Sequence, residues 1–205
     1  METLSASVVD CGVARFVLPG QTESGDRHLV RHTEDGVLIA AIDGIGHGEE
    51  AAHAAKVATS FLKERAEEPL IALVQRCHEK LRSTRGVVLS LASIDTSHGL
   101  MTWLGVGNVQ GVLMRASAKT NHAREMLLLR GGVVGSLLPP LQATVLPIAR
   151  GDTVYFATDG VRSDFGETLT ARENPQRAAD RILAQFQNGY DDALVLVVRL
   201  TGARP

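Results

Sequence analysis

The 205-residue sequence predicts an α+β domain in which helices pack on the outside of antiparallel sheets. Two observations lead to this fold class. Short β-type runs separated by Gly, Asn, Ser and Pro fill most of residues 86–160. Helical periodicity is confined to residues 49–81 and 175–186, so that the order is strands, two helices, many strands, one helix and a last strand.

The N-terminal quarter contains the first strands. Residues 4–9 and 13–18 are rich in apolar and small residues and are separated by Asp10-Cys11-Gly12, which predicts two strands or a hairpin. Residues 19–26 form a turn-rich connection. The apolar run 37–42 then closes on Asp43-Gly44, as expected of a buried strand that ends in a turn.

Three segments have helical spacing. Residues 49–65 carry an apolar stripe of Ala, Phe and Leu, with Glu49 and Glu50 in the first turn, where acids are favoured. Pro69 restarts the chain, and residues 70–81 form a second stripe. The third helix is predicted over residues 175–186, with Asn174 or a neighbour as its N-cap.

The remaining elements are strands. The predicted β-type runs in the second half are residues 86–95, 100–107, 109–115, 124–131 and 152–160, and the last strand covers residues 193–200. We expect one domain over residues 1–200 and a C-terminal tail over residues 201–205.

Composition limits the functional classes. The chain is 44% hydrophobic and 21% charged with a net charge of -2, and its Lys and Arg residues are scattered, so no nucleic-acid partner is expected. No segment approaches the roughly 20 apolar residues that cross a bilayer. The N-terminus has an acid, Glu2, and no base before its short apolar stretch, unlike a signal peptide. We therefore expect a cytoplasmic protein without a membrane partner.

Carboxylates gather at the ends of apolar strands. Asp43 and Asp159 each end an apolar run and precede Gly, while Asp191 and Asp192 precede the last strand. One Asp-Gly after a strand is usually only a turn, but three such segments favour a site. Carboxylates held close together repel and require cations, and hard oxygen ligands suit Mg²⁺ or Mn²⁺.

The glycines beside Asp43 extend this interpretation. Gly44 has no side chain, so a backbone carbonyl can turn toward the same ion or a substrate can approach closely. Gly46 and Gly48 lead to the start of the helix at residue 49, whose free amides favour anions. The sequence therefore predicts that a cation and a phosphate bind side by side.

Four motifs occur in the order and spacing of one family. They are Gly25-Asp26, D-G-I-G-H-G at residues 43–48, R-G-D-T-V-Y-F-A-T-D-G-V at 150–161 and D-D-A-L-V-L-V-V at 191–198. Together they resemble the metal-dependent protein phosphatase (PPM) family in its SpoIIE-like bacterial branch. The resemblance spans nearly the whole chain and implies a four-layer α/β/β/α sandwich, with two antiparallel sheets flanked by helices.

The resemblance also implies a site. Asp43 would be shared by two Mn²⁺ or Mg²⁺ ions, Gly44 would be a backbone-carbonyl ligand, and Asp159 and Asp191 would bind one ion. Asp26 would hold metal-bound water. His47 either protonates the leaving oxygen or caps or orients the helix start, and both interpretations stay open.

The implied activity is hydrolysis of phosphoserine and phosphothreonine in proteins by a water that the dinuclear centre activates, without a phospho-enzyme. The chain has almost no room for a regulatory domain, and in this it resembles the stand-alone phosphatase of the stressosome. The expected partners are phosphorylated STAS-domain scaffold proteins.

Two positions depart from the family pattern. Asn108 stands where many members have Asp, and because an amide binds a hard cation less well than a carboxylate, a third metal is not expected. The N-terminal arginine that binds phosphate in many members has no clear match, and Arg15 is the nearest candidate.

Two other functions compete with this interpretation. G-I-G-H-G could be a dinucleotide-binding turn, but a second helix follows where a βαβ unit requires a parallel strand. A phosphatase-like module that binds a phosphorylated partner without cleaving it is the other alternative, although every acid of the dinuclear site is retained.

Overall fold

The computed structural model describes residues 8–117, 124–170 and 172–202. Two antiparallel sheets form its centre. The first contains, in spatial order, β1 (Val9–Phe16), β11 (Ala193–Leu200), β10 (Thr153–Ala157), β6 (Gln110–Met114) and β7 (Arg124–Met126).

The second sheet contains β2 (Asp26–His32), β3 (Gly36–Gly44), β4 (Val87–Asp95), β5 (Leu100–Val106) and β8 (Leu129–Arg130), and β9 (Thr144–Pro147) also pairs with β5. Among the described strands, every ladder is antiparallel except that between β5 and β8.

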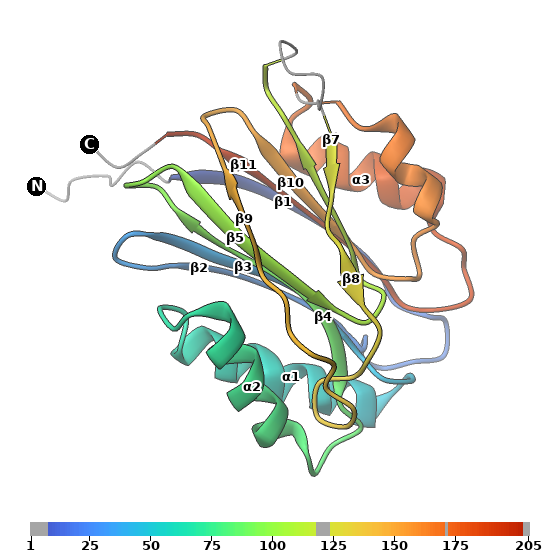
Figure 1. Ribbon diagram of the computed structural model, residues 1–205. Coiled ribbons are helices and arrows are strands. Elements are labelled where there is room, and N and C mark those ends of the chain that lie inside the picture. Colours follow the sequence, from blue (N-terminus) through green and yellow to red (C-terminus); the bar gives the residue numbers. More distant parts are fainter. Residues whose placement is uncertain (1–7, 118–123, 171, 203–205) are drawn as a thin grey trace, which may run out of the picture.

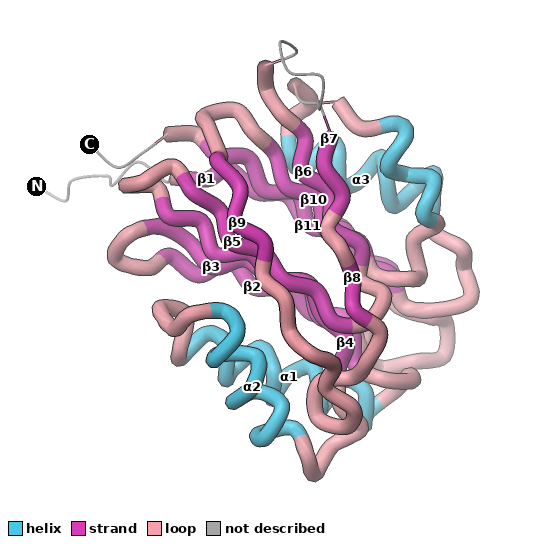
Figure 2. Tube along the Cα trace, viewed as in Figure 1, coloured by secondary structure: helices cyan, strands magenta, loops and turns pink. Residues whose placement is uncertain are grey.

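Helices cover the outer face of each sheet. The helices α1 (Glu49–Glu64) and α2 (Leu70–Leu81) contact the second sheet, and α3 (Pro175–Phe186) contacts the first. Figures 1 and 2 show the resulting layers, with the strands between the two sets of helices. The predicted four-layer α/β/β/α sandwich is confirmed.

Three apolar cores follow from the two-residue period of the strands. In β3, Ile39 and Ala41 face the first sheet, while Leu38, Ala40 and Ile42 face α1 and α2. Trp103 and Phe156 fill the space between the sheets. This double burial makes the central strands continuously apolar, and it fixes their ends relative to one another.

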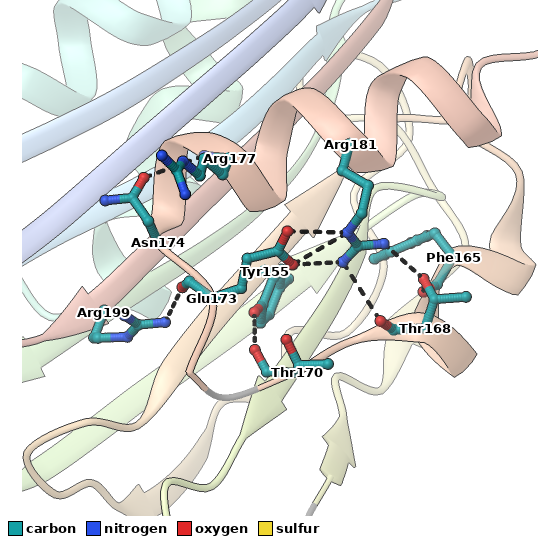
Figure 3. A network of polar contacts seen from close by, with 9 residues as sticks. All are labelled: Tyr155, Phe165, Thr168, Thr170, Glu173, Asn174, Arg177, Arg181 and Arg199. Atoms are coloured by element: carbon teal, nitrogen blue, oxygen red, sulfur yellow. Dashed lines mark hydrogen bonds and ion pairs between the residues drawn. The ribbon is translucent and has the colours of Figure 1, made fainter.

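A polar network holds the segment before α3 against the first sheet (Figure 3). Arg181 of α3 donates to Glu173 at 2.8 Å and to the backbone oxygen of Thr168 at 3.4 Å. The buried Tyr155 of β10 donates its hydroxyl to the backbone oxygen of Thr170 at 3.0 Å. Asn174 caps α3, as predicted, by accepting from two backbone amides.

The N-terminal prediction is wrong. Residues 4–7 lie outside the described part of the chain, and residues 9–16 form one continuous strand, not two strands or a hairpin. The reason is tertiary: β1 pairs residue by residue with the apolar β11. At Gly12 the missing side chain lets the start of α3 approach, so this glycine serves packing and not a turn.

Three other strands differ from the sequence interpretation. β2 falls on the polar segment DRHLVRH, and its position at the edge of the sheet explains the weak apolar pattern. The predicted strand over residues 124–131 is divided into β7 and β8, which belong to different sheets. The four-residue β9 was not predicted.

The topology also bears on the dinucleotide alternative. After α1 and α2 the chain enters β4, which runs antiparallel to β3. A βαβ unit requires parallel strands, so the dinucleotide-binding interpretation is excluded. In the described ranges, no helix combines the length and the apolar character that a membrane crossing needs.

The close approach at Gly12 gives a stability prediction. A Cβ there would lie 2.3 Å from the backbone nitrogen of Gln176, so α3 must move in the variant Gly12→Ala. We expect the free energy of unfolding in urea to fall by about 1–3 kcal/mol, the usual cost of overpacking. Gly131→Ala is the control, because nothing lies within 4 Å of its added Cβ. Equal stability of the two variants would contradict the packing described.

Candidate metal centre

Three of the predicted acids line one cleft. Asp43 ends β3, Asp159 follows β10, and Asp191 precedes β11, so the two sheets deliver their carboxylates to one end of the sandwich. The cleft has a volume of about 410 Å³, and its lining includes Asn108 and Gly132. Strands far apart in sequence therefore place three acids around one space.

Asp26 lies behind this cleft. It is the first residue of β2, opposite Asp43 in the ladder, and is 2% exposed. Its Oδ2 accepts a hydrogen bond from Thr158 Oγ1 at 2.7 Å. Thr158 Oγ1 in turn accepts from the amide of Leu194 at 2.8 Å, so one hydroxyl connects Asp26 with β11 and with the end of β10, the strands next to Asp191 and Asp159.

The electrostatics of the cluster favour a cation. Burial, followed by repulsion from Asp26 and the other acids, raises the pKa of Asp43 to about 9. Burial is also the main cause that raises the pKa of Asp26 to about 7, opposed by its hydrogen bond from Thr158. Burial and the neighbouring acids also raise the pKa of Asp191. A divalent ion offsets this repulsion and lets the carboxylates ionise.

Asp192 is a buried acid to which the sequence analysis gave no role. It is 4% exposed, and its two oxygens accept from the amides of Leu18 at 2.8 Å and Gly25 at 2.7 Å. These bonds fasten the loop that leads into Asp26. The Asp-Asp pair at residues 191–192 marks this position in the sequence, but the sequence does not show which amides donate to the second carboxylate.

Gly44 has a packing role in the structure. A Cβ at this position would lie 2.1 Å from the carbonyl oxygen of Ala51, in the first turn of α1. The amide of Gly44 donates to the carbonyl of Gly25 at 3.1 Å, which ties the end of β3 to the residue before Asp26. The glycine thus lets α1 sit directly on the acidic cluster. Its role as a carbonyl ligand stays a prediction.

His47 lies in the turn between Gly46 and Gly48, whose φ angles of +85° and +79° require glycine. The side chain is exposed, and its Nδ1 lies 3.4 Å from Nε2 of Gln21. The N-cap of α1 is Gly48, with no side-chain cap, so the interpretation of His47 as a cap is wrong. The turn that carries His47 connects Asp43, near the end of β3, with the start of α1.

Asn108 contacts a predicted ligand directly. Its Nδ2 donates to Oδ2 of Asp159 at 2.8 Å. A carboxylate here would repel Asp159, whereas the amide supplies a donor and fixes one oxygen of that side chain. Asn188 donates to the backbone oxygen of Asp159 at 3.1 Å, so this acid is held on two sides.

Arg15 is exposed on β1 and lies beside Asp26 and Arg27. Its Nη2 is 2.5 Å from Nδ1 of His28. Burial and the two arginines lower the pKa of His28 to about 4, so the imidazole is neutral and can accept from Arg15. Arg15 and the neutral His28 thus form a pair between β1 and β2, the edge strands of the two sheets, and a phosphate-binding role for Arg15 stays a prediction.

The donor set fits magnesium or manganese better than a metal that needs a closed protein cage. Among the described residues, no three His, Cys, Asp or Glu side chains lie close enough together to hold a metal ion by themselves, so waters or a substrate would have to complete the coordination. Mg²⁺ is commonly bound by one or two carboxylates together with several waters and substrate phosphates. An acidic cleft with room for water meets that requirement.

Comparison with known proteins identifies the family. The model of the stage II sporulation protein E (SpoIIE) family matches residues 33–201, and the chain belongs to this family. Phosphoserine phosphatase RsbX of Bacillus subtilis (strain 168) is 24% identical over 101 residues, which are 49% of this chain and 51% of RsbX. The chain thus matches about half the length of this curated relative.

Solved structures confirm the PPM-type fold. A structure described as "The bacterial stressosome: a modular system that has been adapted to control secondary messenger signaling" is 28% identical, with a TM-score of 0.85 over 93% of this chain and 99% of that one. RsbX in complex with magnesium is 19% identical, with a TM-score of 0.82 over 94% of this chain and 96% of that one. The predicted resemblance to SpoIIE-like phosphatases is confirmed.

The raised pKa values predict how pH acts on stability. The folded pKa values of Asp26 and Asp43, about 7 and about 9, exceed the ordinary value of 3.8. The folded metal-free protein therefore keeps protons that the unfolded chain has lost. The contribution of these groups to the free energy of unfolding is fully present below about pH 4 and is lost as the pH rises toward 9.

Because a cation binds the ionised carboxylates, MnCl2 should raise the melting temperature more at about pH 8 than at about pH 5. Thermal melting with EDTA or with MnCl2 at both pH values measures this difference. Asp43→Asn should lose much of the manganese shift. The electrostatic account fails if the shift is the same at both pH values and in the variant.

Proposed function

We propose that this protein is a metal-dependent protein serine/threonine phosphatase. The observation that carries the proposal is the convergence of Asp43, Asp159 and Asp191, from three strands of two sheets, on one cleft of a SpoIIE-family chain. The name of the relative RsbX, a phosphoserine phosphatase, supports the same reaction.

Two Mn²⁺ or Mg²⁺ ions would occupy the cleft. Asp43 would contact both, Asp159 and Asp191 would complete one ion, and the carbonyl of Gly44 would bind the other. Bound divalent ions lower the pKa of water toward neutrality and offset the charge of a phosphoryl group. The magnesium complex of RsbX supports the choice of metal.

The chain's own residues would then orient the reaction. Asp26, held by Thr158, would accept a hydrogen bond from bound water, and its oxygen is already positioned by the bond of 2.7 Å. Asn108 would keep Oδ2 of Asp159 in one orientation. Asp192 would hold the loop before Asp26 through two backbone amides. Each contact keeps a carboxylate from rotating away from the cleft.

His47 would donate a proton to the leaving serine or threonine oxygen. It is exposed, and it lies in the turn between Asp43 and the start of α1. An alkoxide is a strong base, so its departure is faster when a nearby acid protonates it.

The proposed substrates are phosphorylated STAS-domain proteins of a stressosome scaffold. The support comes from the structural likeness to a protein described in the context of the stressosome, which covers 93% of this chain, and from the likeness to RsbX. The alternative is an inactive phosphatase-like module that binds the same phosphorylated partner.

A phosphate-release assay tests the reaction. We expect the protein with MnCl2 or MgCl2 to release phosphate from a serine-phosphorylated STAS-domain protein, and EDTA to stop the release. Loss of a residue that only orients a metal ligand lowers metal affinity or activity about 10–100-fold. The variants Asp43→Asn and Asp159→Asn lose a proposed ligand itself, so we expect the rate to fall at least about 100-fold.

The matched control is Asp95→Asn, because Asp95 ends β4 at the opposite end of the same sheet, paired with Gly36. It should keep the wild-type rate, and circular dichroism should show that all variants are folded. Phosphoprotein binding without phosphate release would support the inactive module instead. Unchanged turnover in both cleft variants would refute the assignment of the ligands.

Two substrates with different leaving groups test the role of His47 as a proton donor. We expect His47→Ala to lower kcat at least about 100-fold on a phosphoserine protein, in the range of general acid catalysis. The loss on p-nitrophenyl phosphate should be much smaller, because p-nitrophenolate leaves without a proton. His53→Ala, an exposed histidine one turn into α1, is the control. A loss of equal size on both substrates would rule out the proton-donor role.

A further inference from the structure

The two most exposed large hydrophobic side chains of the described residues are Tyr190, at 87%, and Leu137, at 72%. Single exposed apolar residues are common on protein surfaces. These two, however, lie on segments that border the same cleft: Tyr190 precedes Asp191, and the backbone oxygen of Leu137 lies against Gly132. They thus stand at two rims of the candidate metal centre.

The backbone that carries Tyr190 is tightly held. Asn188 donates its amide to the oxygen of Gly160 at 2.9 Å and its side chain to the oxygen of Asp159 at 3.1 Å. Its Oδ1 accepts from the amide of Tyr190 at 2.9 Å, and Gly189 turns the chain at a φ of +77°. The backbone at Tyr190 is therefore fixed relative to Asp159 and Asp191.

The segment that carries Leu137 is held in a similar way. The carbonyl of Leu137 accepts from the amide of Val133 at 2.8 Å, and Val134 pairs with Val87 of β4. The amide of Gly135 donates to the buried His78 of α2 at 2.9 Å. Both apolar side chains are thus presented by anchored backbone, which reduces the entropy lost when a partner binds.

We propose that Tyr190 and Leu137 form a docking surface for the polypeptide of a phosphorylated protein, on either side of the phosphorylated residue. This inference rests on the proposed phosphatase function. The expected partner carries apolar side chains that flank its phosphoserine or phosphothreonine. Tyr190 supplies a large ring with few rotatable bonds, the kind of side chain that dominates binding energy at protein interfaces.

The position of the two side chains favours a polypeptide over a small phosphate ester. The cleft of about 410 Å³ has Asp43, Asp159 and Asp191 in its lining, but not Tyr190 or Leu137. A small ester can therefore react inside the cleft without touching them. Only a longer molecule that extends over both rims buries the two apolar groups, and their burial stabilises that complex selectively.

The test compares two substrates. For each variant we measure kcat/KM for a serine-phosphorylated STAS-domain protein and divide it by kcat/KM for p-nitrophenyl phosphate. We expect Tyr190→Ala and Leu137→Ala each to lower this ratio about tenfold. Most of the change should be in the KM of the phosphoprotein. Tyr190→Phe should keep most of the wild-type ratio, because it keeps the ring.

The control is Leu100→Ala, which truncates another exposed leucine at the far end of the second sheet. Its ratio should equal that of the wild type. Absence of activity of the wild type on both substrates with MnCl2 would refute the phosphatase proposal itself. If the wild type is active on both substrates and the ratio is unchanged in both alanine variants, the docking proposal is wrong.

Sedimentation velocity tests whether the docking surface binds a second copy of this chain instead of a phosphoprotein. We expect the wild type and Tyr190→Ala to sediment alike. A wild-type dimer that dissociates in Tyr190→Ala would show that the surface is a self-contact, and would overturn the proposed partner.

Discussion

Like-charged carboxylates held close together at the mouth of the sandwich are the constraint on which this site depends. Burial makes the charge of Asp43 unfavourable, and repulsion from Asp26, Asp159, Asp191 and Asp192 adds to this cost. Such a group stays protonated or binds a cation, because an ionised and unpaired carboxylate in this position is unfavourable. Under the proposed function, metal binding and phosphate binding would both follow from this arrangement, since divalent ions supply the positive charge that a phosphoryl group requires.

The fold maintains this unfavourable arrangement through rigid apolar layers. β3 is buried on both faces, between α1 and the first sheet, and β11 is buried between α3 and the second sheet. The strand ends cannot separate without exposing these cores. Local hydrogen bonds complete the restraint: Thr158 connects Asp26 to β11, and Asn108 fixes Asp159. The anchored loops at the rims extend the same rigidity to the surface that a protein partner would contact.

The elements and site residues that a local sequence pattern marks could be predicted from the sequence. The helices α1, α2 and α3 and the buried strands β3, β4 and β11 were evident from periodicity. The acids beside β3 and β10 were evident from the glycines that follow them, and Asp191 from the Asp-Asp pair before β11. The edge strand β2 could not be predicted, because its half-exposed polar residues form a strand only when β3 is beside them. The clamp by Asp192 and the bond from Asn108 depend on contacts between segments 51 or more residues apart, which one sequence does not reveal. Gly12 resembled a turn residue, although it is a point of close helix packing.

The most direct measurement is a crystal soaked in MnCl2 and examined by anomalous scattering at the manganese edge. The account predicts two manganese peaks in the cleft, with Asp43 contacting both ions, Asp159 and Asp191 contacting one, and none bound to Asn108. Absence of manganese from this cleft in crystals that bind it elsewhere, or ions that do not touch Asp43, would contradict the central claim that the carboxylate cluster is a metal centre.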